Sequence, residues 1–159
     1  MFRFYLLIAV FLSNFALAQE LTLPPAKNFF LDSQKVWKKQ TPILIMFSIP
    51  GCGYCKIIKE EVIGPMAEME EYQNKIIIRH INAGSFDEIR NFYNTEVSQN
   101  EFSFQNAINF FPTVLLVDQY GVPLEKVIGV ANEDYYWTDL DGLIESATIK
   151  LTNKMKAKL

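Results

Sequence analysis

The sequence has few of the residues that commonly bind metals. Its 159 residues include two cysteines, Cys52 and Cys55, and one histidine, His80. A structural zinc site needs four ligands, typically from two pairs of cysteine or histidine residues. Covalent haem attachment needs a histidine directly after the second cysteine, and Lys56 stands there. We therefore expect neither a metal nor another cofactor.

An excess of one charge and long apolar runs are also missing. With 15 basic and 18 acidic residues, the formal net charge is −3, and no basic stripe is visible. The composition therefore argues against nucleic acid as a partner. After the N-terminal residues, no run is long and apolar enough to cross a bilayer, which takes about 20 residues. No internal repeat or low-complexity segment interrupts the chain, so a single domain is expected.

The first residues have the pattern of a secretory signal peptide. Arg3 makes the start positive, residues 5–12 are apolar, and Ala16-Leu17-Ala18 offers small residues for a signal peptidase. We expect a signal peptide over residues 1–18 and the folded domain over residues 19–159. The alternative is a retained membrane anchor, although the apolar run is short for a span. No cysteine lies at the cleavage site, so a lipid anchor is not supported. Export would place the protein in the periplasm, where disulfides persist.

The two cysteines follow the most apolar stretch of this domain. The run Ile43–Ser48 predicts a buried strand, Pro50-Gly51 predicts a turn, and the residues after Cys55 predict a helix. Cys52 then lies at or near a helix N-terminus, where free backbone N–H groups favour a thiolate. We interpret the pair as a redox couple. A structural disulfide is the alternative, but two intervening residues close too small a loop to stabilise much.

The remaining pattern predicts a mixed sheet flanked by helices. The first two long strands are joined through a helix and should be parallel, whereas the last two should form an antiparallel hairpin. The expected strands are 42–48, 75–82, 113–118 and 122–128. The expected helices are 28–40, 56–62, 66–72 and 85–94, with a kink or break at Gly64-Pro65 and with Ser85 as the cap of the fourth. A loop over 95–101 should lead into a short helical turn over 102–109. The last helix should be capped by Asn132 or Thr138 and should end in a basic tail.

Three motifs in this order resemble the thioredoxin superfamily. They are Cys52-Gly53-Tyr54-Cys55 after a strand, Phe111-Pro112-Thr113 before a hairpin, and Val127-Ile128-Gly129-Val130 at the end of the last strand. The resemblance spans roughly residues 28–151. It is greatest for exported, periplasmic thioredoxin-like thiol–disulfide oxidoreductases, because the Gly-Tyr dipeptide between the cysteines is similar to that of periplasmic disulfide isomerases. The segments 59–66 and 129–136 are similar to thioredoxin-like proteins encoded with sulfur-oxidation systems.

The resemblance implies a thioredoxin fold and assigns roles to the site residues. Cys52 would be the nucleophile and Cys55 would resolve the mixed disulfide. Pro112 would be cis, and would expose the backbone of Phe111 for pairing with a substrate chain. Gly53 and Tyr54 would also contact substrate, although Tyr54 could equally be a solvated turn residue.

The sequence departs from the family pattern at three places. Met46 stands where ordinary thioredoxins carry a buried aspartate, Gly51 replaces the usual tryptophan, and the segment 83–101 is longer than the family minimum. No carboxylate is therefore offered to move protons for Cys55. Glu60 and Glu61 could serve as a proton relay instead. We expect His80 to be a strand-end residue rather than a catalytic one.

The resulting expectation is a periplasmic thiol–disulfide oxidoreductase that acts as a reductase. Its partners would be substrate proteins with disulfides or dithiols and a membrane thiol carrier that supplies electrons, and it would be a monomer. One alternative is a binding or carrier module of the same fold without redox turnover. The others are an oxidase, which a high redox potential would indicate, and a disulfide isomerase. Isomerases of this kind usually dimerise through an added domain, and none is visible in this sequence.

Overall fold

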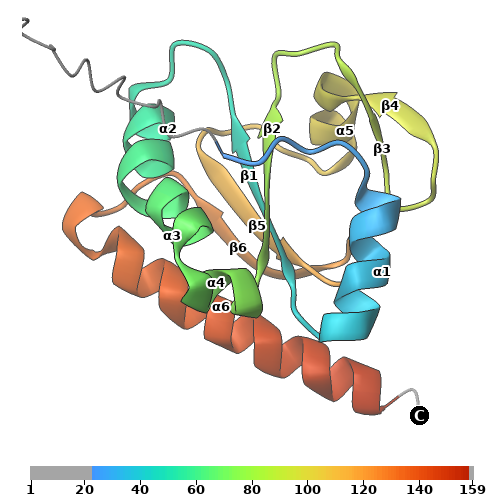
Figure 1. Ribbon diagram of the computed structural model, residues 1–159. Coiled ribbons are helices and arrows are strands. Elements are labelled where there is room, and N and C mark those ends of the chain that lie inside the picture. The colour runs from blue at the N-terminus through green and yellow to red at the C-terminus, as the bar shows by residue number, and fades with distance from the viewer. Residues whose placement is uncertain (1–22, 158–159) are drawn as a thin grey trace, which may run out of the picture.

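The computed structural model describes residues 23–157, so the signal peptide expected over residues 1–18 lies outside the described part of the chain (Figure 1). Within that part, no helix combines the length and the apolar character that crossing a bilayer requires. The described residues form one α/β domain with a four-stranded sheet between two groups of helices (Figure 1). The predicted fold class is confirmed.

The sheet has the strand order β2-β1-β5-β6. Its strands are β1 (Ile43–Ser48), β2 (Ile77–Asn82), β5 (Thr113–Val117) and β6 (Pro123–Ile128). β1 runs parallel to β2 and antiparallel to β5, and β5 and β6 form the antiparallel hairpin that the sequence predicts. Residues 43–47 of β1 are buried, as the apolar run requires of a central strand covered on both faces.

Helices α1 (Phe29–Lys39) and α5 (Gln99–Gln105) lie on one side of the sheet (Figure 1). The Phe102 ring stacks on Phe29 and on Phe47 of β1, with ring centroids 4.8 Å and 6.2 Å apart. On the other side, α6 (Glu133–Lys156) crosses α4 (Glu70–Lys75), where the Tyr72 hydroxyl donates to the Asp141 carboxylate at 3.1 Å.

The helix after the cysteines bends at Gly64-Pro65 without breaking. It comprises α2 (Gly53–Ile58), the π-helical turn η1 (Lys59–Ile63) and α3 (Gly64–Glu68), and the Gly64 N–H donates to the Lys59 carbonyl oxygen five residues back. Proline has no N–H to continue the ordinary hydrogen-bond ladder, and a π-turn is one way a helix absorbs such an interruption. The predicted irregularity is present, but the chain remains helical through it.

The prediction of a helix over residues 85–94 is wrong. The chain instead forms β3 (Glu88–Arg90) and β4 (Glu96–Ser98), which pair antiparallel. Ser85 does not cap a helix, because its Oγ accepts the N–H of Asp87, two residues on, and closes a short turn. The Asn91 side chain accepts two further N–H groups in the loop between the strands. These side-chain bonds favour a turn over a helix.

The loop predicted over 95–101 and the helical turn over 102–109 are also misplaced. β4 occupies the first of these segments, and α5 begins at Gln99 and ends at Gln105. Ser98 caps α5 by accepting the Glu101 N–H at 3.1 Å. The pattern of serine followed three residues later by glutamate marks a helix start and could have located it. Near the other end of the chain, Asn132 caps α6 as predicted, and the basic tail up to Lys156 belongs to that helix.

Candidate functional site

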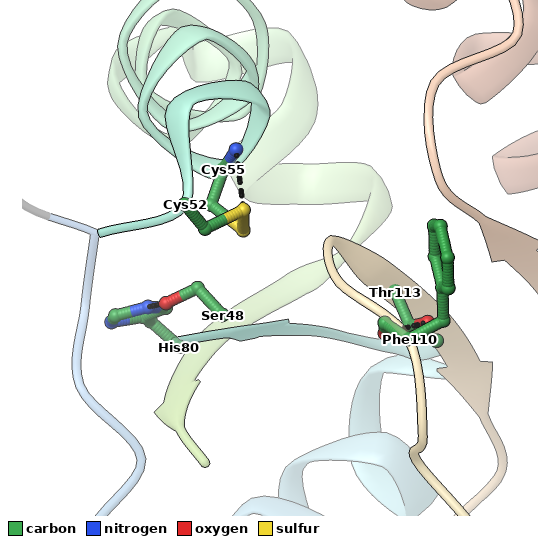
Figure 2. The surroundings of a disulfide bond; sticks show 6 residues. All are labelled: Ser48, Cys52, Cys55, His80, Phe110 and Thr113. Carbon is green, nitrogen blue, oxygen red and sulfur yellow. Dashed lines mark hydrogen bonds between the residues drawn. A yellow bond between two sulfur atoms is a disulfide. The ribbon is translucent and has the colours of Figure 1, made fainter. Parts of the chain in front are cut away.

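Cys52 and Cys55 form a disulfide where β1 passes into α2 (Figure 2). The S–S distance is 2.08 Å and the Cα atoms are 5.2 Å apart. Gly51, with φ +79°, turns the chain between the strand and the helix, a backbone conformation that favours glycine. Cys52 caps α2, and its Sγ accepts the backbone N–H of Cys55 at 3.1 Å. The predicted position of Cys52 at a helix N-terminus is therefore observed.

The two sulfur-bearing residues differ in exposure. Cys52 is half-buried, whereas Cys55 is only 4% exposed and packs in the core. Gly53 and Tyr54 lie between them in the first turn of α2, and both are exposed, with Tyr54 at 53%. A disulfide that approaches from solvent therefore reaches Cys52 before Cys55.

The Phe111–Pro112 peptide bond is cis, as the resemblance implies. Phe47 of β1 pairs with Thr113 of β5, so Pro112 lies at the edge of the sheet where β1 ends and the cysteines follow. Figure 2 draws Phe110 and Thr113, which flank this bond, among the surroundings of the disulfide. The Pro112 carbonyl oxygen accepts the Gly129 N–H at 2.8 Å, which ties the segment to the end of β6. Contact of Phe111 and Pro112 with a substrate chain stays a prediction.

His80 lies inside β2 rather than at the strand end expected from the sequence. Its Nε2 is 2.7 Å from the Oγ of Ser48, the last residue of β1 (Figure 2). Burial, followed by the nearby positive charge of Lys59, lowers the pKa of His80 to about 4. The signal that could have found this pair is the presence of polar residues near the ends of two parallel strands, because these ends meet at one edge of a sheet.

Ser48, His80 and the disulfide line one cavity of about 380 Å³. Its walls include both cysteines, Ser48 and His80, together with Lys59 and Glu60 of the π-turn. Of the two glutamates proposed as a relay, only Glu60 lines this space, whereas Glu61 is exposed. The cavity therefore brings titratable groups from β2 and η1 next to both cysteines.

A larger cavity of about 530 Å³ lies between β6 and α6 and contains neither cysteine. The buried Tyr136 hydroxyl, whose pKa burial raises to about 12, is on its wall. Elsewhere in residues 23–157, no three His, Cys, Asp or Glu side chains lie close enough together to hold a metal ion.

The comparison with protein families agrees with this geometry. The family model described as "Thioredoxin-like domain" matches residues 29–142. A search of curated proteins found no matching sequence.

Three solved thioredoxins are similar to this chain at low sequence identity. A thioredoxin h from poplar is 18% identical, with a TM-score of 0.52, and the match covers 75% of this chain and 96% of that one. Thioredoxin NaTrxh from Nicotiana alata is 19% identical, with a TM-score of 0.49 and coverage of 76% and 95%. Periplasmic thioredoxin SoxS from Paracoccus pantotrophus, in its reduced form, is 22% identical, with a TM-score of 0.46 and coverage of 67% and 98%. The poplar structure supports the assignment of the fold.

Proposed function

Since the chain belongs to the thioredoxin-like domain family, we propose that it is a thiol–disulfide oxidoreductase that exchanges its Cys52–Cys55 couple with disulfides of substrate proteins. The observation that carries this proposal is the unequal exposure of the two linked cysteines at the start of α2. Cys52 is accessible to a partner, whereas the buried Cys55 lies at bonding distance from it. A purely structural disulfide needs no such difference.

The exchange proceeds in two steps from the reduced protein. The Cys52 thiolate attacks one sulfur of a substrate disulfide, forms a mixed disulfide and releases the other substrate sulfur as a thiolate. Cys55 then loses its proton and attacks Cys52 Sγ, which releases the second substrate thiolate and forms the Cys52–Cys55 disulfide. Two electrons pass from the protein to the substrate. The Cys55 N–H that now donates to Cys52 Sγ is placed to stabilise the thiolate of the reduced protein.

The setting and direction of the reaction are part of the proposal. Residues 1–18 have the pattern of a signal peptide, so we place the protein in the periplasm. We assign the reducing direction, with electrons supplied by a membrane thiol carrier and with substrate proteins as the other partner. The protein acts as a monomer in this scheme. The exposed Gly53-Tyr54 turn and the Phe111–Pro112 segment would contact the substrate chain.

An insulin-reduction assay with dithiothreitol as electron donor tests the activity. We expect wild-type protein to accelerate insulin precipitation and Cys52→Ser to be inactive. Ser146→Ala, which removes a hydroxyl far from the cysteines in α6, should retain activity and serves as the matched control. Cys55→Ala should accumulate a mixed disulfide through Cys52 that mass spectrometry can identify. If wild-type protein is no faster than Cys52→Ser with any dithiol donor, the fold serves as a binding module and the proposal is wrong.

A further inference from the structure

The resolving step of the proposed reaction needs a proton acceptor at a buried place. Cys55 is 4% exposed, and only its thiolate is a nucleophile. Near pH 7, hydroxide is too dilute to remove this proton quickly. The side chain at position 46 of β1, on the same face of the sheet as Ser48, is a fully buried methionine and accepts no proton. The acceptor must therefore come from another element that reaches the same cavity.

Ser48 and His80 are placed to supply it. Met46 is paired with His80 and Ser48 with Asn82 in the parallel register, so these side chains share the face of the sheet that lies under α2. Figure 2 shows the hydrogen-bonded Ser48 and His80 side chains on the strand side of the disulfide. Both line the cavity of about 380 Å³ that the two cysteines also line. A polar space of this size has room for several water molecules, each of which needs about 30 Å³.

We propose that His80, held by Ser48, accepts the Cys55 proton through this cavity when the mixed disulfide is resolved. The inference rests on the proposed function and names a further residue of the same site. The thiol proton passes through water or the Ser48 hydroxyl to the neutral imidazole, which becomes imidazolium. The Cys55 sulfur attacks Cys52 Sγ, the bond from Cys52 to the substrate breaks, and the substrate sulfur leaves with the electron pair. The imidazolium then returns its proton to the leaving thiolate or to solvent.

Charged groups from two helical segments surround His80. Lys59 and Glu60 of η1 and Lys56 of α2 line the same cavity, whereas Arg79, the neighbour of His80 in β2, is paired with Asp32 of α1. The backbone N–H and carbonyl of His80 are bonded to Pro24 and Ala26 of the N-terminal segment. Burial and then Lys59 lower the pKa of His80 to about 4, so the imidazole is unprotonated at neutral pH and holds an accepted proton only briefly. The negative charge that develops on Cys55 favours the transfer, and the positive charge of Lys59 opposes lasting protonation.

Reaction with the aromatic disulfide 5,5′-dithiobis(2-nitrobenzoate) tests the proposal, because attack and resolution release separate coloured thiolates. The full reduced chain is mixed with the reagent in a stopped-flow instrument. The first release depends on reagent concentration and reports Cys52, whereas the second does not and reports Cys55. The matched pair is His80→Gln and His80→Glu, which have similar shapes and differ in whether they can take a proton.

We expect His80→Gln to keep the first release and to slow the second by about tenfold or more near pH 7, within the range of general-base catalysis. The deficit should shrink as pH rises, because hydroxide replaces the missing base. His80→Glu should recover part of the rate, Ser48→Ala should slow the second release, and Ser146→Ala should not. An unchanged second release in His80→Gln, or one slowed by the same factor at every pH, overturns the inference. Absence of the second release in wild-type protein would instead contradict the proposed function.

Discussion

The backbone N–H of Cys55 donates to Cys52 Sγ at 3.1 Å, while the Cys55 side chain itself is buried. Cys55 thus donates a hydrogen bond that supports the reactivity of Cys52, while its own side chain is shielded from solvent. This relation, rather than the presence of two cysteines, separates an exchange site from a disulfide that only links the chain.

In the reduced protein, iodoacetamide should modify Cys52 well before Cys55. Cys52 is half-buried and caps α2, whereas Cys55 is almost fully covered. Peptide mapping by mass spectrometry after short exposure measures the two rates, and we expect them to differ by about tenfold or more. Cys52→Ser should leave a slowly reacting protein, and Cys55→Ser a rapidly reacting one. Equal labelling of both residues in folded protein would contradict the assignment of Cys52 as nucleophile.

His80 should make the protein less stable in acid. Its pKa is about 4 in the folded protein, against an ordinary value of 6.5, because of burial and then Lys59. Between these values the unfolded chain binds the proton more readily, so stability present above about pH 6.5 is lost as pH falls towards about 4. We expect a loss of about 2–3 kcal/mol from this group between about pH 7 and pH 4.5.

Urea unfolding of wild type and His80→Gln at both pH values isolates this contribution, because the remaining titratable groups are the same in the two proteins. The variant should show the smaller loss of unfolding free energy on acidification. Parallel pH dependence in both proteins would mean that His80 is not held neutral by the fold.

The ion pair between Asp32 of α1 and Arg79 of β2 should contribute strongly to stability. Arg79 donates from Nε and Nη2 to the two oxygens of a carboxylate that is only 3% exposed, both at 2.6 Å. Asp32→Asn leaves a half-buried guanidinium without its charge partner, and we expect a loss of about 2–4 kcal/mol in urea unfolding.

The exposed pair of Arg90 and Glu96, also at 2.6 Å, provides the control for that experiment. Glu96→Gln should change the free energy of unfolding by less than about 1 kcal/mol, as for other solvated pairs. Similar losses for Asp32→Asn and Glu96→Gln would show that burial does not strengthen the first pair.

Two glycine substitutions should have opposite effects. A Cβ at Gly121, whose φ is +78°, would lie 2.5 Å from a ring carbon of Phe92. We expect Gly121→Ala to lose about 1–3 kcal/mol from the backbone conformation and the clash. Gly142 lies inside α6 with open space around its Cα, so Gly142→Ala should gain about 0.5–1 kcal/mol. Thermal unfolding of both variants measures the two effects. A Gly121→Ala variant as stable as the wild type would contradict the first expectation.

Local patterns predicted the elements that carry the cysteines. The apolar run of β1 and the cap of α6 at Asn132 were readable because burial and capping leave direct traces in neighbouring residues. The segment from Ser85 to Asn94 was misread because side-chain turns and pairing with residues of the N-terminal segment, such as Arg90 N–H to the Lys27 carbonyl, decide its conformation. Such tertiary hydrogen bonds have no local signature.

The site was predictable in part for the same reason. Cys52 and Cys55 are close in sequence, so their disulfide needed no knowledge of the sheet. Ser48 and His80 are 32 residues apart and meet only through the register of two parallel strands. A single histidine in an apolar strand gives no indication of its partner until that register is known.

The most direct measurement is a redox titration of the whole protein against glutathione, with the state of the two cysteines read by thiol labelling and mass spectrometry. A couple that exchanges with other proteins should equilibrate reversibly, with a midpoint between about −300 and −150 mV. The reducing direction favours the lower part of that range. A pair that stays oxidised below about −300 mV, or never equilibrates, would behave as a structural disulfide and contradict the account.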